Sequence, residues 1–317
     1  MSSMTKNNAI LISVVILFVA SSYLIKLSEF IFENHKNETG QPINYNIIES
    51  KEEFDLDRFD SNFISLSNEM IEIYDEHNFS INNFINGNTK KIIIFSSLPD
   101  DFLDFSPLHL RKDLFIKTIL PIVFVENKKI LNERKQILNW WTETDGEEIS
   151  RNFWPEWLNK ICNKYMYNNE NLGELLAKVD IIPISLAITQ AVKESNWGST
   201  NYARQGNAVF GEYTFNIQET IPSQKNSNKE DFVKRKYKNL SESVASYLRN
   251  LNTNKDFKDF RERRKKLRME GKNIVGLEMI DYLKNQNKNS DYIDELKKLM
   301  EENNFKKFDE LFSVVRN

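Results

Sequence analysis

Residues 179–213 of the chain read VDIIPISLAITQAVKESNWGSTNYARQGNAVFGEY, and the other segments are best understood from this stretch outward. Pro183 suits the first turn of a helix, because the N–H group that proline lacks has no partner inside a helix there. Gly198 suits a position just past the other end, where the backbone commonly turns left-handed. The stretch therefore predicts a short helix over residues 184–196.

Glu194 lies in the last turn of this predicted helix. At about 100° per residue, it projects about 20° from Ala187 and about 40° from Gln190, on the side with small residues. Partial burial and the negative end of the helix dipole both favour a protonated carboxyl group, which a general acid needs near neutral pH. The alternative is a carboxylate turned outward at a solvated helix end, and the local sequence leaves both open.

Two motifs follow each other closely here: Glu194-Ser-Asn-Trp-Gly198 and then Asn207-Ala-Val-Phe-Gly211. Together they resemble the glucosaminidase family of peptidoglycan hydrolases, in which an A-x-x-E-S-x-W-G helix end precedes an N-x-F-G turn. The Bax-type branch of that family is the most similar, and the resemblance runs from about residue 96 to residue 310. It implies a mainly α (α+β) fold, namely a lysozyme-like helical domain with a small β-hairpin lobe and an N-terminal helical extension.

The resemblance also implies an activity. It is hydrolysis of the β-1,4 bond on the reducing side of N-acetylglucosamine in peptidoglycan, with Glu194 as general acid and with neither a metal nor an organic cofactor. The residues expected to line the cleft that binds the glycan strand are Trp197, Asn207, Phe210, Gly211 and Tyr213.

Family members also carry a functional tyrosine ahead of their C-terminal helix. Tyr292, in Ser-Asp-Tyr-Ile-Asp-Glu-Leu296, matches that position. The preceding segment departs from the family, because Tyr282-Leu-Lys-Asn-Gln-Asn stands where Y-S-x-R-G is usual. A tyrosine that only packs with Ile293 against Leu296 therefore stays an alternative.

A β-hairpin is predicted directly after the second motif. Alternating apolar residues over 212–217 indicate a strand, and residues 231–237 are the expected return strand. A second catalytic carboxylate is sought on this lobe, and the candidates are Glu230, with Glu219 and Asp231 as rivals. Each is also typical of a solvated loop. If none lies close, the acetamido oxygen of the substrate attacks C1, which is the route we favour; if Glu230 folds in, it activates water.

Composition limits the other function classes. The chain has 317 residues, 40% of them apolar, and a net charge of −3, which argues against a dedicated nucleic-acid binder. Nine glycines and seven prolines favour helices over a turn-rich β fold. Cys162 is the single cysteine, so no internal disulfide forms, and no His/Cys cluster indicates a zinc site.

The N-terminal part is expected to connect the enzyme to a membrane. Residues 9–25 carry no charge and span about 26 Å as a helix, near the lower limit for crossing a bilayer. Residues 1–26 are therefore interpreted as an anchor in the inner membrane that leaves the catalytic domain in the periplasm, and a cleaved signal peptide is the alternative. Residues 27–90 are polar and asparagine-rich, and we interpret most of them as a loose tether or extension with short helices in places, for example over residues 63–74. A small folded domain is the alternative.

Residues 91–178 are interpreted as a helical extension that packs on the catalytic domain. Ile92–Phe95 is either a short strand or an apolar anchor. Helical spacing over residues 110–141 predicts a long helix with a kink at Pro121. Glu126 and Glu133 share a face of it, and we expect partnered structural groups there rather than an acid pair.

Four tryptophans, Trp140, Trp141, Trp154 and Trp157, are clustered in this extension. Trp154-Pro-Glu-Trp-Leu158 begins another predicted helix, so Trp154 and Trp157 are expected in the core rather than against a sugar.

The catalytic domain is expected to span residues 179–317. Ser241 suits the N-cap of a helix that turns Val244, Tyr247, Leu248 and Leu251 inward. A basic run follows at Arg261, Arg263, Arg264, Lys265, Lys266 and Arg268. It could attract wall-peptide carboxylates or anionic lipid, but a solvated helix face is the favoured interpretation.

Two other functions stay open at this level. A lytic transglycosylase also uses one glutamate on a lysozyme-like fold, but the G-x-x-G-L-M-Q turn expected after its acid is absent. A non-catalytic wall-binding or assembly factor could retain the cleft without turnover.

Overall fold

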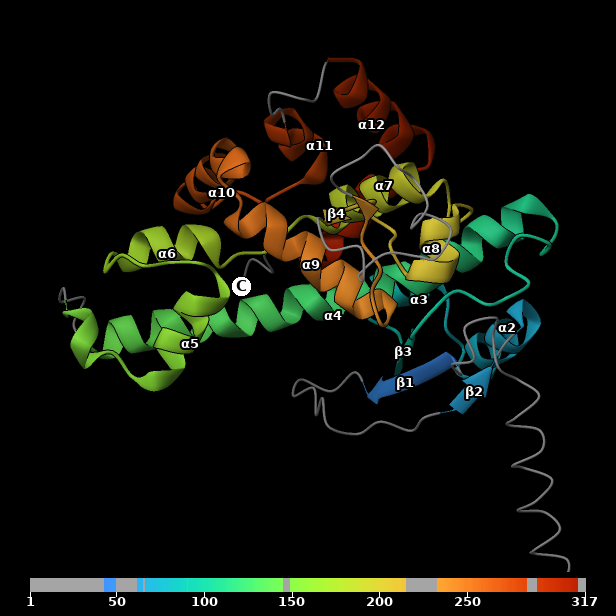
Figure 1. Ribbon diagram of the computed structural model, residues 1–317, viewed down its shortest axis with the longest axis horizontal. Coiled ribbons are helices and arrows are strands. Elements are labelled where there is room, and N and C mark those ends of the chain that lie inside the picture. The colour runs from blue at the N-terminus through green and yellow to red at the C-terminus, as the bar shows by residue number, and fades with distance from the viewer. Residues whose placement is uncertain are drawn as a thin grey trace, which may run out of the picture.

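Helices form most of the described chain (Figure 1). The computed structural model describes residues 43–49, 62–64, 66–89, 91–144, 149–214, 233–283 and 290–312. The mainly α fold is confirmed. Its longest element is α4 (Leu108–Glu143), which continues through Pro121 and contacts both α7 (Ile184–Ser195) and α9 (Leu240–Thr253).

The remaining helices surround this central group. After α4 come η1 (Arg151–Phe153), α5 (Glu156–Lys164) and α6 (Leu172–Lys178), and α8 (Asn201–Gly206) follows α7. The C-terminal part holds η4 (Lys255–Phe257), α10 (Lys258–Met269), α11 (Gly276–Met279), η5 (Ile280–Leu283), α12 (Ser290–Glu302) and η6 (Phe305–Phe312). Helices α11, α12 and η6 all contact α7. The helix that carries Glu194 is thus surrounded by elements from both halves of the chain.

The segment expected to be a loose tether is folded where the structure describes it. Strand β1 (Ile43–Glu49) pairs antiparallel with β2 (Asn62–Ile64) and with β3 (Lys91–Phe95). Helices α2 (Ser67–Glu76) and α3 (Ile81–Ile85) follow β2. Met70, Tyr74 and Phe84 from these helices join the main hydrophobic core. The apolar residues spaced among the asparagines are therefore enough to pack this part. The overall composition of the segment did not indicate that packing. The domain boundaries stay a prediction.

No helix within the described ranges has the length and apolar character needed to cross a bilayer. The predicted anchor at residues 9–25 lies outside those ranges and stays a prediction.

Several local predictions in the extension are confirmed. Ile92–Phe95 forms most of β3 and is buried. Trp154 is buried, and its indole N–H donates to the carbonyl of Ile149 at 2.8 Å. Glu126 pairs with Lys129 at 2.7 Å, and Glu133 with Lys164 at 2.6 Å, so both carboxylates have structural partners.

The N-cap prediction for α9 was wrong by two residues. The helix begins at Leu240, and the side chain of Asn239 accepts from the backbone N–H of Glu242 at 2.8 Å. Asparagine caps a helix as well as serine does, so the earlier polar residue takes the position. The four inward residues predicted on α9 are all buried.

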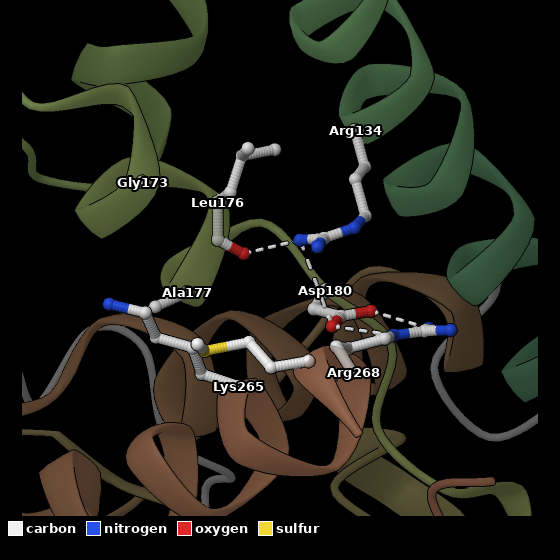
Figure 2. A pocket seen from close by; sticks show the side chains of 8 residues that line it. Arg134, Gly173, Leu176, Ala177, Asp180, Lys265 and Arg268 are labelled. Atoms are coloured by element: carbon white, nitrogen blue, oxygen red, sulfur yellow. Dashed lines mark hydrogen bonds and ion pairs between the residues drawn. The ribbon is translucent and has the colours of Figure 1, made fainter. Parts of the chain in front are cut away.

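A pocket of about 150 Å³ lies between α4, α6 and α10 (Figure 2). Arg134, Asp180, Lys265 and Arg268 are among its lining residues. The pocket lies beside the turn that precedes α7, and none of its lining residues is Glu194 or a hydrogen-bond partner of Glu194.

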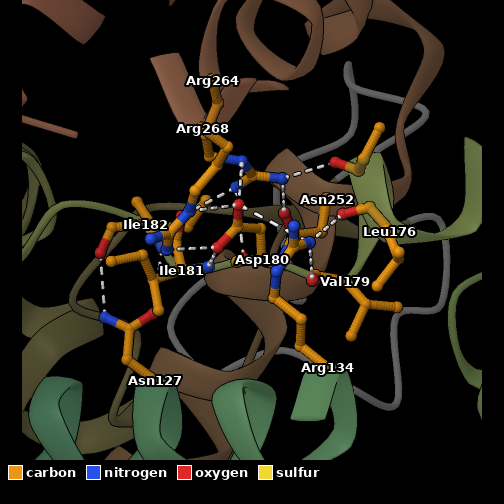
Figure 3. A network of polar contacts seen from close by, with 11 residues as sticks. Asn127, Arg134, Leu176, Val179, Asp180, Ile181, Ile182, Asn252, Arg264 and Arg268 are labelled. Carbon is orange, nitrogen blue, oxygen red and sulfur yellow. Dashed lines mark hydrogen bonds and ion pairs between the residues drawn. The ribbon is translucent and has the colours of Figure 1, made fainter. Parts of the chain in front are cut away.

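Asp180 is the centre of a buried polar network in that turn (Figure 3). Its carboxylate accepts from Arg268 at 2.8 and 3.1 Å, while Arg134 and Arg264 approach it to 3.7 and 3.9 Å. Arg264 is fully buried and also donates to the carbonyls of Ala177 and Ile181. The network therefore fixes the entry into α7.

The same network corrects the prediction for the basic run. Arg264 is 0% exposed and Arg261 only 7%, so two of the six cations do not lie on a solvated face. Arg261 donates to the carbonyls of Leu251 and Asn254 at 3.1 and 2.7 Å. Guanidinium groups can be buried here because carbonyl groups at helix ends and Asp180 supply acceptors.

Candidate active site

The end of α7 turns the chain sharply away. Asn196, Trp197 and Gly198 all have left-handed backbone angles, with φ of 48°, 57° and 75°. A side chain at Gly198 has no room, because an ideal Cβ would lie 2.8 Å from Leu98 and 2.9 Å from Phe115. Glycine therefore lets this turn pack on α4, and Glu194 lies just before the turn.

Glu194 is half-buried and is held by a chain of hydrogen bonds. The hydroxyl of Tyr292, on α12, donates to Oε1 of Glu194 at 2.9 Å. Gln190, one helical turn before Glu194, donates from Nε2 to the Tyr292 oxygen at 3.1 Å. Tyr247, on α9, donates in turn to Oε1 of Gln190. Three helices thus converge on one carboxyl group.

Tyr292 and Tyr247, the two tyrosines of this hydrogen-bonded series, stay protonated over the ordinary pH range. Burial, and then the charge of Glu194, raise the pKa of Tyr292 above its usual value. Burial likewise raises the pKa of Tyr247, with smaller contributions from Tyr292 and Glu194. Each hydroxyl therefore keeps its hydrogen and acts as a donor.

The second motif brings the backbone against Glu194. Gly211 has a φ of 63°, and an ideal Cβ on it would lie 3.2 Å from Oε2 of Glu194 and 2.8 Å from Nζ of Lys234. Because Gly211 has no side chain, Glu194 and Lys234 can both lie close to the turn. Oε1 is thus held by Tyr292, while Oε2 faces the turn at Gly211.

A two-stranded hairpin continues from that turn. Tyr213 in β4 (Tyr213–Thr214) pairs antiparallel with Lys234 in β5 (Val233–Lys234). Nζ of Lys234 donates to the carbonyl of Gly211 at 2.6 Å and lies 4.0 Å from the Tyr213 ring centroid. Tyr213 is 55% exposed, so it offers aromatic surface to solvent next to the Gly211 turn. This described part confirms the predicted hairpin.

Glu212 brings a second carboxylate into this region. Its side chain accepts from the hydroxyl of Tyr237, and the Tyr237 hydroxyl also lies 3.2 Å from Oγ of Ser246 on α9. Ser246 directly precedes Tyr247, so neighbouring residues of α9 connect to both carboxylates. The sequence candidates Glu230, Glu219 and Asp231 lie outside the described residues.

The other predicted cleft residues have packing roles. Asn207 caps α8 in a left-handed conformation and donates to the carbonyls of Tyr237 and Lys238, each at 3.2 Å. Phe210 is buried and stacks on Tyr247 with ring centroids 3.9 Å apart. These contacts therefore stabilise the structure around the site.

Trp197 also packs against other side chains. Its ring contacts Phe115 and Phe305, with centroids 6.4 and 6.0 Å away, and Lys112 Nζ lies 4.5 Å from its centroid. A contribution of Trp197 to glycan binding stays a prediction.

Sequence reasoning missed four residues of this arrangement: Gln190, Lys234, Glu212 and Tyr247. Gln190 lies four residues before Glu194, the spacing at which helix side chains touch, so its role could have been found. Tyr247 was expected only to face inward. Within the described ranges, no group of three or more His, Cys, Asp or Glu side chains is arranged to hold a metal ion.

Comparison with known proteins adds two findings. The Glucosaminidase family profile, described as mannosyl-glycoprotein endo-beta-N-acetylglucosaminidase, matches residues 169–305. Over 199 residues the chain is 31% identical to Protein bax of Escherichia coli (strain K12). The aligned region covers 60% of this chain and 68% of that protein. No solved structure matches the chain significantly.

Proposed function

We propose, from the premise that this chain belongs to the glucosaminidase family in its Bax-type branch, that Glu194 is the general acid of a peptidoglycan N-acetylglucosaminidase. Membership in the family indicates a glycan hydrolase. The bond cleaved is the β-1,4 bond on the reducing side of N-acetylglucosamine. The observation that carries this proposal is the setting of the half-buried Glu194 carboxyl group, with Oε1 held by Tyr292 and Oε2 beside the Gly211 turn.

The first step transfers one proton. The C1–O bond breaks through an oxocarbenium-like state, and the leaving oxygen takes the proton from Oε2 of Glu194. The electron pair of the broken bond stays with that oxygen, so the product ends in a neutral hydroxyl. The hydrogen bond from Tyr292 stabilises the carboxylate that remains, because a hydrogen bond to the charged form favours that form.

The nucleophile we favour is the acetamido oxygen of the substrate, as in substrate-assisted hydrolases. It forms a bond to C1 as the glycosidic bond breaks. Water then attacks C1 and gives a proton to the Glu194 carboxylate, while the bond between C1 and the acetamido oxygen breaks and its electron pair restores the acetamido group. Tyr213, which is exposed two residues after Gly211, supports a sugar substrate in general, since an exposed aromatic ring suits stacking on a sugar ring. A carboxylate of the hairpin, Glu230 or a rival, acting on water is the alternative.

The proposal is tested by digesting purified sacculi and analysing the soluble muropeptides by mass spectrometry. We expect products with reducing N-acetylglucosamine ends from the unaltered protein, and a loss of at least about a hundredfold in rate for Glu194→Gln. Glu133→Gln is the matched control, because Glu133 also accepts from a tyrosine hydroxyl, at 2.8 Å from Tyr165, but in another part of the fold.

The outcomes separate the three candidate functions. Products with anhydro-muramic ends would instead identify a lytic transglycosylase, and the absence of products would support a non-catalytic wall-binding or assembly factor. Full activity of Glu194→Gln would contradict the assignment of the acid.

We also propose that residues 9–25 hold the enzyme in the inner membrane with its catalytic domain in the periplasm. The uncharged stretch in the sequence supports this location. Fractionation of cells that express the full chain tests it, since recovery outside the membrane fraction would contradict an uncleaved anchor.

A further inference from the structure

A run of hydrogen bonds with a single direction leads from the protein core to Glu194. Its members are Tyr247, Gln190, Tyr292 and Glu194, and each hydrogen bond is donated toward Glu194. Tyr247 and Gln190 come before Tyr292 in this series, and each is only 5% exposed.

The direction is set at the buried end. Tyr247 stacks on Phe210 with an interplanar angle of 4°, which limits the movement of its ring. Its hydroxyl donates to Oε1 of Gln190, and an amide that accepts at Oε1 must present Nε2, a pure donor, to its other neighbour.

The direction is then passed to the carboxyl group. The Tyr292 oxygen accepts from Nε2 of Gln190, so its own hydrogen is available to Oε1 of Glu194. A tyrosine hydroxyl has only one hydrogen. If the amide of Gln190 turned over, Oε1 would face Tyr292 and compete for that hydrogen.

We propose that Gln190 and Tyr247 are positioning residues of the active site: through Tyr292 they keep Oε1 of Glu194 as a hydrogen-bond acceptor and so confine the transferable proton to Oε2. This inference rests on the proposed function, because it concerns the proton that the general acid gives to the leaving oxygen. When Oε2 loses its proton, the donor at Oε1 is already in place to stabilise the new charge.

Other charged groups also surround Glu194, and they bear on its pH dependence. Lys234 of β5 lies against Gly211, beside Oε2. Lys193, the neighbour of Glu194 on α7, pairs with Glu295 on α12. Glu212 lies on the hairpin side. The test alters none of these groups; Gln190→Glu adds one further carboxylate, whereas Tyr247→Phe and Tyr292→Phe add no charge.

Two variants test the proposal. In Gln190→Glu, the new carboxylate accepts from both Tyr247 and Tyr292, so Tyr292 no longer donates to Glu194. In Tyr247→Phe, the amide of Gln190 loses the partner that sets its orientation. We expect kcat to fall about a hundredfold for Gln190→Glu and about tenfold for Tyr247→Phe. KM stays within about twofold, because neither residue is proposed to touch the substrate.

The pH profile separates positioning from a structural effect. Loss of the donor at Oε1 favours the protonated form of Glu194, which is the active form of the acid. The alkaline limb of the kcat/KM profile therefore moves to higher pH, by about one unit in Gln190→Glu, where the like charge of the new carboxylate adds to the lost donor. Tyr247→Phe adds no charge, so a shift of its limb in the same direction comes from positioning alone. Tyr292→Phe, which removes the last donor directly, moves the limb in the same direction. A variant that only loosens the fold lowers the rate at every pH without moving the limb.

Tyr165→Phe is the matched control, because Tyr165 is also buried and donates to a glutamate, Glu133, at 2.8 Å. It should leave the profile unchanged. An unaltered protein that releases no muropeptides would overturn the proposed function. If that protein is active but Gln190→Glu and Tyr247→Phe, both folded by circular dichroism, keep its kcat and its alkaline limb, the positioning proposal is wrong.

Discussion

Gly211 shows how much of the site depends on a single residue. Its backbone is left-handed, and it has no side chain at a place where an ideal Cβ would lie 2.8 Å from Lys234 and 3.2 Å from Glu194. Gly87, Gly198 and Gly271 share the first property, but among the glycines that the structure describes only Gly211 lies beside Glu194. The two can therefore be separated by experiment.

We predict that Gly211→Ala abolishes most of the activity, because the new methyl group displaces Glu194 or Lys234. Gly87→Ala is the control: Gly87 has a φ of 69°, but an added Cβ would meet nothing within 4 Å. Both variants should lose about 1 kcal/mol of stability through backbone strain, measured by denaturant unfolding, while muropeptide release falls only for Gly211→Ala. Equal activities in the two variants would show that the contact is unimportant.

At the scale of elements, the site depends on how α8 is connected to the return strand. Asn207 ends α8 with a φ of 52° and bonds the chain that leaves β5 through the carbonyls of Tyr237 and Lys238. The hairpin that carries Tyr213 is therefore fixed to the catalytic region by one side chain as well as by strand pairing.

Asn207→Gly keeps the left-handed turn and removes only the side-chain bonds. We predict a loss of about 1–3 kcal/mol of stability, because buried carbonyl groups lose their donor, together with a lower rate of muropeptide release. Asn304→Gly is the control, since Asn304 has the same φ of 52° but is exposed. Thermal unfolding of the pair measures the difference, and equal melting temperatures would contradict the role of the Asn207 amide.

At the scale of the whole molecule, the Asp180 network joins the parts of the chain that lie before and after α7. Burial alone favours the protonated carboxyl group, but Arg264, Arg268 and Arg134 outweigh it and hold the pKa of Asp180 below its ordinary value of 3.8. A carboxyl group with a lowered pKa stabilises the folded state above its ordinary pKa and loses that contribution as the pH falls through its folded pKa.

We predict that Asp180→Asn loses about 3 kcal/mol of stability at pH 7, because buried guanidinium groups lose their counter-charge. The loss shrinks below about pH 4, where the unaltered protein itself loses this contribution. Glu156→Gln removes an exposed pair, in which both side chains are more than 70% exposed, and should change stability by less than about 1 kcal/mol. Urea unfolding at pH 7 and pH 3 tests both, and a difference independent of pH would sink the ionic interpretation.

The motifs around Glu194 predicted more of the fold than of the site. Pro183 and Gly198 delimited α7 to within one residue, because both act through local backbone geometry. The hairpin and the long helix through Pro121 were predicted from the spacing of their apolar residues, which is also a local property of the sequence. The burial of Arg261 and Arg264 could not be predicted, since it depends on carbonyl groups that other helices present to them.

By itself, the sequence determined the helix with Glu194 at its end, the glycine turns around it and membership in a glycan hydrolase family. These properties depend on neighbouring residues and on motifs that are contiguous in the chain. Only the tertiary structure decided which groups hold the carboxyl group. Tyr247 and Tyr292 lie 57 and 102 residues from Gln190 along the chain, and hydrogen bonds over such separations exist only after helices have packed.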